Sequence, residues 1–170
     1  MWLSTVAENI ILNSIKLKEL NLSLVDYAAF TENIIEQINP NDKIQRIYFE
    51  SKDDCVGICD VMLLKQIMIS ILVNSVKNDF ISQNIEIKLT KNSSNRLIVK
   101  IAFLVEQINI EKTLETFEPL VTNSKINIVS KYSLGLAAVQ RCVYLLDGKI
   151  NLERDDRYVV IAVRLPLVSI

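Results

Sequence analysis

The first 21 residues carry an apolar seam that recurs at steps of three and four positions. Its members are Leu3, Val6, Ile10, Asn13, Leu17 and Leu20. This spacing predicts a helix over about residues 4–21, with Ser4 as its N-cap. The helix either packs against its own domain or forms half of a two-helix hairpin or dimer bundle. In a dimer, Val6, Ile10 and Leu17 line the seam and the polar Asn13 fixes its register.

Period-two and period-3.6 patterns then follow each other along the chain. A short strand over 22–25 leads into a helix that Asp26 caps and that stops before Pro40. Alternation over 44–50 predicts a strand. A second short strand over 55–58 precedes a helix capped by Asp60. The broad apolar face of that helix comprises Leu63, Leu64, Ile67, Met68, Ile71, Leu72 and Val76.

The pattern in the second half of the chain predicts two hairpins separated by a helix. Strands over 85–89 and 97–105 flank a polar turn, and the second strand is apolar on both faces, which predicts a place in mid-sheet. Residues 110–133 are less regular. A helix then begins at Ser133 or Leu134 and ends at Asp147, with Gly148 as its natural C′ residue. The expected closing hairpin pairs 149–153 with 158–165 across a turn at 154–157.

This order of elements predicts an α+β fold. Helices come first, strands and helices then mix, and the hairpins are antiparallel. We expect a two-layer α/β sandwich with helices on one face of a mixed, mostly antiparallel sheet and an N-terminal helix appended. At 170 residues the chain fits one domain plus a short appendage, divided into residues 1–21 and 22–170.

Composition excludes several classes of function. The chain is 50% apolar and 23% charged with a net charge of −1, so it builds a core and carries no electrostatic footprint for nucleic acid. No apolar run reaches the roughly 18 residues that span a bilayer, and we expect a cytoplasmic protein. The absence of histidine excludes Ser-His-Asp and Cys-His catalysis, as well as histidine phosphorylation within this chain. We expect Asp53-Asp54 and Asp155-Asp156 to lie in turns, and we interpret them as solvent-exposed residues without a catalytic role.

The three cysteines do not change this picture. Cys55 and Cys59 stand four positions apart, and Cys142 is distant from both. This is not the spacing of a zinc site, and no histidine is present to complete one. We interpret the three as reduced thiols in or near the core.

Several short motifs occur in a fixed order. They are residues 64–77 with Asn74, Phe117-Glu118-Pro119-Leu120, Ser133-Leu134-Gly135-Leu136, Asp147-Gly148-Lys149-Ile150 and Arg164-Leu165-Pro166. Together they resemble the N-box, the F-box, the second glycine box and the closing strands of the catalytic ATP-binding domain of sensor histidine kinases. This is the Bergerat or GHKL ATPase fold. The resemblance runs from about residue 22 to 167, and residues 2–21 are similar to the second helix of that family's dimerisation hairpin.

The resemblance implies roles for five residues around the phosphates. Asn74 falls on the asparagine that ligates Mg²⁺, and Lys77 falls on the basic position that meets phosphate. Ser70 stands where a further asparagine is usual. Gly135 and Leu136 occupy the second glycine box, in which Gly135 is the one glycine present, at a helix N-terminus suited to phosphate.

The box that grips adenine in this family is absent. The family's Asp-x-Gly-x-Gly box precedes the phenylalanine of the F-box by a fixed number of residues. With Phe117 as that phenylalanine, the resemblance aligns Phe103 with the aspartate, and Val105 and Gln107 with the two glycines. Phenylalanine cannot accept a hydrogen bond from the adenine amino group, and its ring can fill the adenine slot instead. No Asp-x-Gly occurs between residues 79 and 146, so a shift of the alignment does not restore the box.

The resemblance therefore implies a pseudokinase of two-component signalling. We expect no cofactor and no catalytic residue, and action through a protein partner, either a kinase or a response-regulator receiver, with homodimerisation through the N-terminal helix. Three alternatives stay open. They are an active sensor kinase with an upstream phosphoacceptor histidine, a kinase-like phosphotransfer protein, and a plain α+β interaction module. Mg-ATP is the cofactor only if the domain is active, and Asn74 is then the metal ligand.

Overall fold

The computed structural model describes residues 20–38, 46–76, 81–105, 110–117 and 133–167. In chain order the elements are β1 (Leu22–Asp26), α2 (Tyr27–Ile38), β2 (Arg46–Ser51), β3 (Val56–Asp60), α3 (Val61–Val76), β4 (Ile81–Lys91), β5 (Arg96–Val105), α4 (Ile110–Phe117), α5 (Ser133–Leu145), β6 (Lys149–Asp155) and β7 (Tyr158–Pro166). Of the helix expected over 4–21, only Leu20 and Asn21 fall within the described residues.

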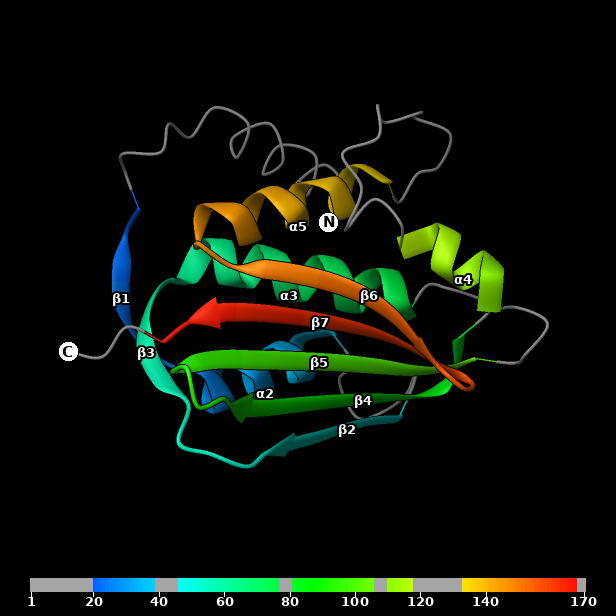
Figure 1. The fold of residues 1–170 in the computed structure, drawn as a ribbon, viewed down its shortest axis with the longest axis horizontal. Coiled ribbons are helices and arrows are strands. Elements are labelled where there is room, and N and C mark those ends of the chain that lie inside the picture. Colours follow the sequence, from blue (N-terminus) through cyan, green and yellow to red (C-terminus); the bar gives the residue numbers. More distant parts are fainter. Residues whose placement is uncertain (1–19, 39–45, 77–80, 106–109, 118–132, 168–170) are drawn as a thin grey trace.

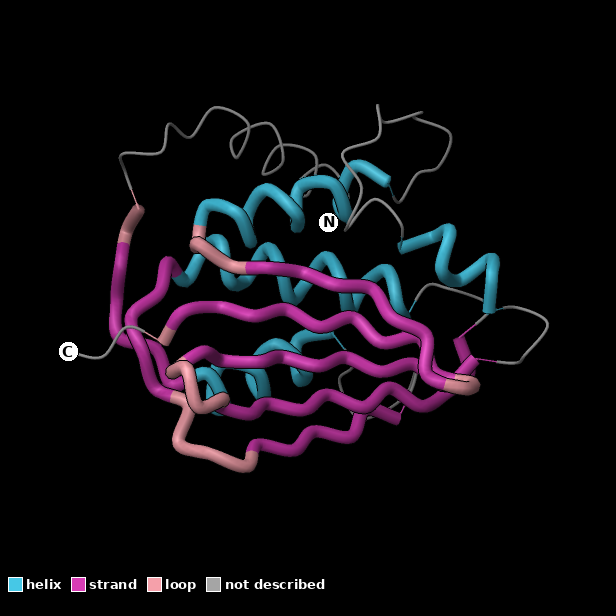
Figure 2. Tube along the Cα trace, viewed as in Figure 1, coloured by secondary structure: helices cyan, strands magenta, loops and turns pink. Residues whose placement is uncertain are grey.

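Five strands form one mixed sheet in the order β2-β4-β5-β7-β6. β2 runs parallel to β4, and the other neighbours are antiparallel. β5 lies at the centre, as its apolar pattern predicts. A separate two-stranded ribbon pairs β1 with β3, and Figure 2 shows it set apart at one end of the sheet. The expected mixed, mostly antiparallel sheet is confirmed.

Helices and sheet form two layers. Figure 1 views the sheet with α2 and α3 behind it, and α5 lies alongside α3. One face of β5 is buried against the helices, while the other face carries the exposed Lys100. The buried side chains of β5 are Leu97, Val99, Ile101, Phe103 and Val105. No helix in the described part of the chain is both long enough and apolar enough to cross a membrane.

Asp60 caps α3, as the sequence predicts. Its Oδ1 accepts hydrogen bonds from the backbone N–H groups of Met62, at 2.9 Å, and Leu63, at 3.1 Å. Its Oδ2 accepts a third, from the backbone N–H of Asn21, at 2.9 Å. One buried carboxylate thus fixes both the start of α3 and the residue that leads into β1. The expected cap of α2 by Asp26 is confirmed in the same way.

Two features differ from the sequence analysis. The segment 110–133, which was expected to be irregular, begins with the helix α4, and one face of this helix is apolar. At the end of α5, the residue with positive φ is Asp147 (φ 53°), not Gly148. Asp147 donates to the carbonyl of Tyr144 and Gly148 to that of Val143, which is a Schellman motif with Asp147 at C′. The short aspartate side chain tolerates this conformation.

Gly148 is required for a different reason. A Cβ atom there would lie 2.7 Å from Cδ2 of Leu165 and 2.8 Å from the carbonyl oxygen of Arg164. The absence of a side chain therefore lets the end of α5 approach β7 closely.

Candidate functional site

A ladder of polar side chains runs along the otherwise apolar helix α3. The side-chain amide of Gln66 donates to Oγ of Ser70 at 2.8 Å. Nδ2 of Asn74 donates to the backbone carbonyl of Ser70 at 2.6 Å. The steps of four residues place all three on one side of the helix. They are buried, Asn74 being 9% exposed and Ser70 5%.

The hydrogen bond of Asn74 determines what its side chain can offer. The nitrogen is engaged by the helix itself, so the amide is oriented with Oδ1 as its acceptor atom. An amide oxygen is an acceptable Mg²⁺ ligand, but one such oxygen does not make a metal site. In the described residues no group of three or more histidine, cysteine, aspartate or glutamate side chains could hold a metal ion.

Phe103 lies in the middle of the sheet, on the face covered by helices. It pairs with Ile85 of β4 and Val159 of β7. Its ring is fully buried and stacks on Phe117, the last residue of α4, with ring centroids 5.3 Å apart and planes inclined by 11°. This stacked pair connects β5 with α4.

The resemblance aligns Val105, the last residue of β5, with the first glycine of the Asp-x-Gly-x-Gly box. β5 continues through Val105, which is 1% exposed. Its backbone N–H donates to the carbonyl oxygen of Arg157 at 2.9 Å.

The entry of α5 is built into the core. Gly135 lies in the first turn of the helix, and Leu136 directly after it is fully buried. The side chain of Leu136 thus packs in the core, while the backbone N–H groups in the first turn of a helix are suited to meet an anion.

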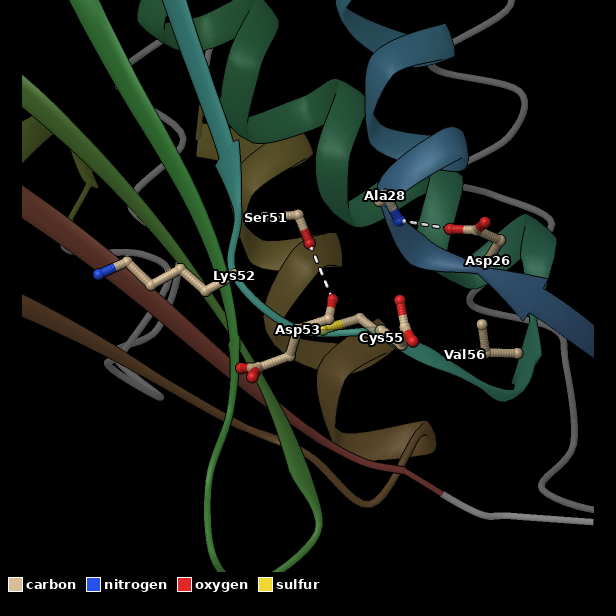
Figure 3. Close-up of a pocket in the computed structure, with 8 residues that line it drawn as sticks. Asp26, Ala28, Ser51, Lys52, Asp53, Cys55 and Val56 are labelled. Atoms are coloured by element: carbon tan, nitrogen blue, oxygen red, sulfur yellow. Dashed lines mark hydrogen bonds between the residues drawn. The ribbon is translucent and has the colours of Figure 1, made fainter.

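A cavity lies elsewhere, between the β2–β3 connection and the start of α2 (Figure 3). It measures about 520 Å³ and is lined by Asp26, Ala28, Ser51, Lys52, Asp53, Asp54, Cys55 and Val56. Its carboxylates have structural tasks, because Asp26 caps α2 and Asp53 accepts a hydrogen bond from the backbone N–H of Lys91 at 2.8 Å. Asp53 and Asp54 are exposed, consistent with solvated loop residues.

Residues 59–169 match the sequence profile of a family described as histidine kinase-, DNA gyrase B-, and HSP90-like ATPase. The match spans more than half of the chain. The chain belongs to this ATPase family. No curated protein sequence matches it significantly.

Solved structures with the same fold as this family member include three histidine kinases. Histidine kinase AdeS of Acinetobacter baumannii is 18% identical with a TM-score of 0.69, over 98% of this chain and 77% of that one. Full-length ShkA in complex with AMPPNP is 18% identical with a TM-score of 0.70, over 99% of this chain and 36% of that one. The mycobacterial sensor histidine kinase MprB is 17% identical with a TM-score of 0.63, over 87% of this chain and 99% of that one. At these identities the likeness concerns the fold.

In this ATPase-family chain the structure places some of the sequence-predicted residues and not others. Ser70 and Asn74 come together on α3, and Phe103 and Val105 lie on β5. Lys77, Gln107 and the seam residues Val6, Ile10, Asn13 and Leu17 lie outside the described residues.

Gln66 and the contact between Phe103 and Phe117 were not predicted from the sequence. The signal for Gln66 was present, because polar residues at positions 66, 70 and 74 share one side of an apolar helix.

Proposed function

We propose that this chain is a pseudokinase domain of cytoplasmic two-component signalling, in which nucleotide binding is lost or weak. The observation that carries this proposal is the buried stack of Phe103 on Phe117. The resemblance assigns the position of Phe103 to the carboxylate that holds adenine. A ring that is already packed offers no acceptor to the base.

A phenylalanine at position 103 offers adenine no hydrogen-bond acceptor. A hydrogen bond to a charged group contributes about 1.5–3 kcal/mol. Its loss weakens binding by roughly 10- to 150-fold. Val105, buried in an extended strand, adds an obstacle, because a base would have to displace packed side chains.

Calorimetric titration of the chain with ATP and Mg²⁺ tests the proposal. We expect either no binding or a Kd above about 100 μM, which is about −5.5 kcal/mol. A tighter Kd would overturn the proposal. The matched control is Asn74→Ala, because binding in the family's site would depend on this residue.

The second candidate is the catalytic domain of an active sensor kinase. The observation that favours it is Asn74, whose Oδ1 keeps its acceptor capacity while Nδ2 is held by the helix. Mg-ATP would then bind with Asn74 as ligand, and the phosphoacceptor histidine would lie upstream or on another chain. ATP hydrolysis that Asn74→Ala abolishes would establish this candidate. A kinase-like phosphotransfer protein would likewise need a histidine from outside, because this chain has none.

A domain without nucleotide chemistry acts through contacts. The partner we propose is a kinase or a response-regulator receiver, together with a second copy of the chain joined through Val6, Ile10, Asn13 and Leu17. Sedimentation at increasing concentration tests the homodimer. We expect a monomer–dimer equilibrium. Ile10→Glu should shift it to the monomer, because burying a charge in an apolar seam costs free energy. A chain that stays monomeric at all concentrations contradicts it.

A further inference from the structure

The β1–β3 ribbon has one face toward the core and one toward solvent, because alternate side chains of a strand point to opposite faces. The inner face carries Val25 and Cys59, which are buried. On the outer face Leu22 is 55% exposed, Leu24 59% and Val56 46%. We call Leu22, Leu24 and Val56 the ribbon patch. The solvent face of an antiparallel sheet is ordinarily polar, so three exposed aliphatic side chains on one short ribbon indicate a contact surface.

β1 is also an edge strand. Among the described strands it pairs with β3 alone, and Figure 1 shows it on the outer side of the ribbon. Edge strands usually carry charged side chains, which discourage pairing with another chain. Both edges of the main sheet follow this rule, since Glu50 of β2 forms an ion pair with Lys88 at 3.0 Å and β6 has the exposed Glu153. β1 has no charged residue before Asp26, its last, so its edge is open to an added strand.

The cavity at the end of β1 is acidic. Asp26, Asp53 and Asp54 line it, and Lys52 is the one cation among its lining residues. Lys52 extends away from Asp26 in Figure 3, and its Nζ lies 3.9 Å from Oε1 of Glu50. Asp26 and Asp53 accept hydrogen bonds from backbone N–H groups, but a carboxylate has acceptor capacity beyond these bonds. The cavity therefore suits a cationic group that is supplied from outside.

We propose that β1 binds an extended segment of a partner protein as an added strand, with a lysine or arginine side chain of that segment in the acidic cavity. Main-chain hydrogen bonds to the open edge supply affinity, and alternate side chains that cover the ribbon patch supply specificity. In an antiparallel addition, the more stable pairing, the basic residue comes opposite Asp26 and two apolar residues come opposite Leu24 and Leu22. The inference stands apart from nucleotide loss, because it uses no residue of α3 or β5.

Size and charge both favour a single segment over a second copy of the chain. A stable dimer buries about 800 Å² on each partner through roughly 20–30 residues, far more than the ribbon patch and the cavity comprise. A second β1 paired across a two-fold axis would add apolar side chains but no cation, because the strand contains no lysine or arginine. The acidic cavity would then have no partner of opposite charge.

Titration of the isotope-labelled full chain with a synthetic peptide, followed by amide NMR, tests the proposal. The peptide is acetyl-Thr-Arg-Thr-Ile-Thr-Val-Thr-amide, and its matched control has glutamate in place of arginine. We expect saturable shifts in residues 22–26 of β1 and none in residues 46–51 of β2, the other edge named above. The control peptide should bind at least about tenfold more weakly, because its charge repels the cavity. Equal affinity of the two peptides, or no shift in residues 22–26, would overturn the proposal.

Variants of exposed residues test the two parts of the surface separately. Leu24→Thr keeps a strand-forming residue and should weaken peptide binding about fivefold through lost apolar contact. Tyr48→Thr makes a similar change on β2, where Tyr48 is 52% exposed, and should leave affinity unchanged. Asp54→Lys should weaken binding at least about tenfold, whereas Glu153→Lys, the same reversal on β6, should not. Equal effects within either pair would contradict the proposed surface.

The same spectra distinguish this proposal from its alternatives. Shifts in residues 22–26 that depend on chain concentration without peptide would assign the edge to a second copy and overturn the proposal. ATP with Mg²⁺ should leave the peptide affinity unchanged, because the ribbon patch and the cavity share no residue with the candidate nucleotide site. Failure of the pseudokinase proposal and failure of strand addition can thus be told apart.

Discussion

Phe103 and Phe117 stack with ring centroids 5.3 Å apart and join β5 to α4. α4 has 8 residues, which is too short to be stable in isolation. Its place in the fold therefore depends on what its buried side chains contact. Phe117 is fully buried, and its ring stacks on Phe103.

Phe117→Ala should lower the free energy of unfolding by about 3–5 kcal/mol, because it leaves an aromatic-sized cavity over Phe103. Urea denaturation measures this. Tyr48→Ala, a truncation at a half-exposed position of β2, should stay within about 0.5 kcal/mol. A loss of less than about 1 kcal/mol for Phe117→Ala would show that α4 does not depend on the stack.

Asp60→Ala should cost about 2 kcal/mol, the upper end for an N-cap, because the carboxylate holds Asn21 as well as the start of α3. Asp60→Asn keeps an acceptor for the cap and should cost less. Asp26→Ala removes an exposed cap of the same chemistry from α2 and serves as the control, at about 1 kcal/mol. Equal losses for Asp60→Ala and Asp26→Ala in urea denaturation would mean that the bond to Asn21 contributes nothing.

Gly148→Ala should destabilise the chain by about 1–3 kcal/mol, because its Cβ would overlap Leu165 and the backbone of Arg164. Asp147→Gly, one residue earlier, should be neutral or slightly stabilising, because glycine adopts positive φ without strain. Thermal unfolding distinguishes the two. The opposite ranking would indicate that Gly148 serves the helix end rather than the approach to β7.

Stability should fall at alkaline pH partly through Cys142. Burial, helped by the negative charge of Asp60, raises the pKa of this thiol from 9.0 to about 12. The folded chain thus retains a proton that the unfolded chain releases near pH 9. The contribution is fully present below pH 9.0 and is lost as pH rises toward about 12. Burial raises the pKa of Cys59 as well, in the same direction.

Urea denaturation between about pH 8 and 11 measures this dependence. Cys142→Ala should show a shallower fall of the free energy of unfolding with pH than the wild type, whatever its cost at neutral pH. Identical slopes would exclude Cys142 as a source of the dependence.

The parts of the fold that the sequence predicts are those set by local chemistry. Asp26 and Asp60 precede apolar helical patterns, and both cap the helices that follow. The two-sided apolar pattern of β5 correctly places it in mid-sheet. α4 was missed because its apolar face consists of few residues in a short polar segment. Gly148 was misplaced because glycine is the commonest C′ residue, and the close approach of β7 is a tertiary contact.

The candidate site was less predictable. Spacing places Ser70 and Asn74 on one side of α3, but it does not show that the Asn74 nitrogen bonds to the helix backbone. Likewise, the sequence places an aromatic ring at position 103 but does not indicate that Phe117 packs on it. The roles assigned to Asn74, Lys77 and Gly135 from the resemblance, and the loss of the adenine loop, stay predictions.

The pairing of β2 has a consequence for the order of folding. β2 bonds to β4 alone in the main sheet, and its partner residues Arg46 and Asn84 are 38 positions apart. The neighbouring hairpins β4–β5 and β6–β7 close over short turns, so they lose less chain entropy on forming. β2, which is paired on one side only, is thus expected to join after the β4–β5 hairpin has formed and to detach before it opens, and its amides would report a partial opening that leaves both hairpins intact.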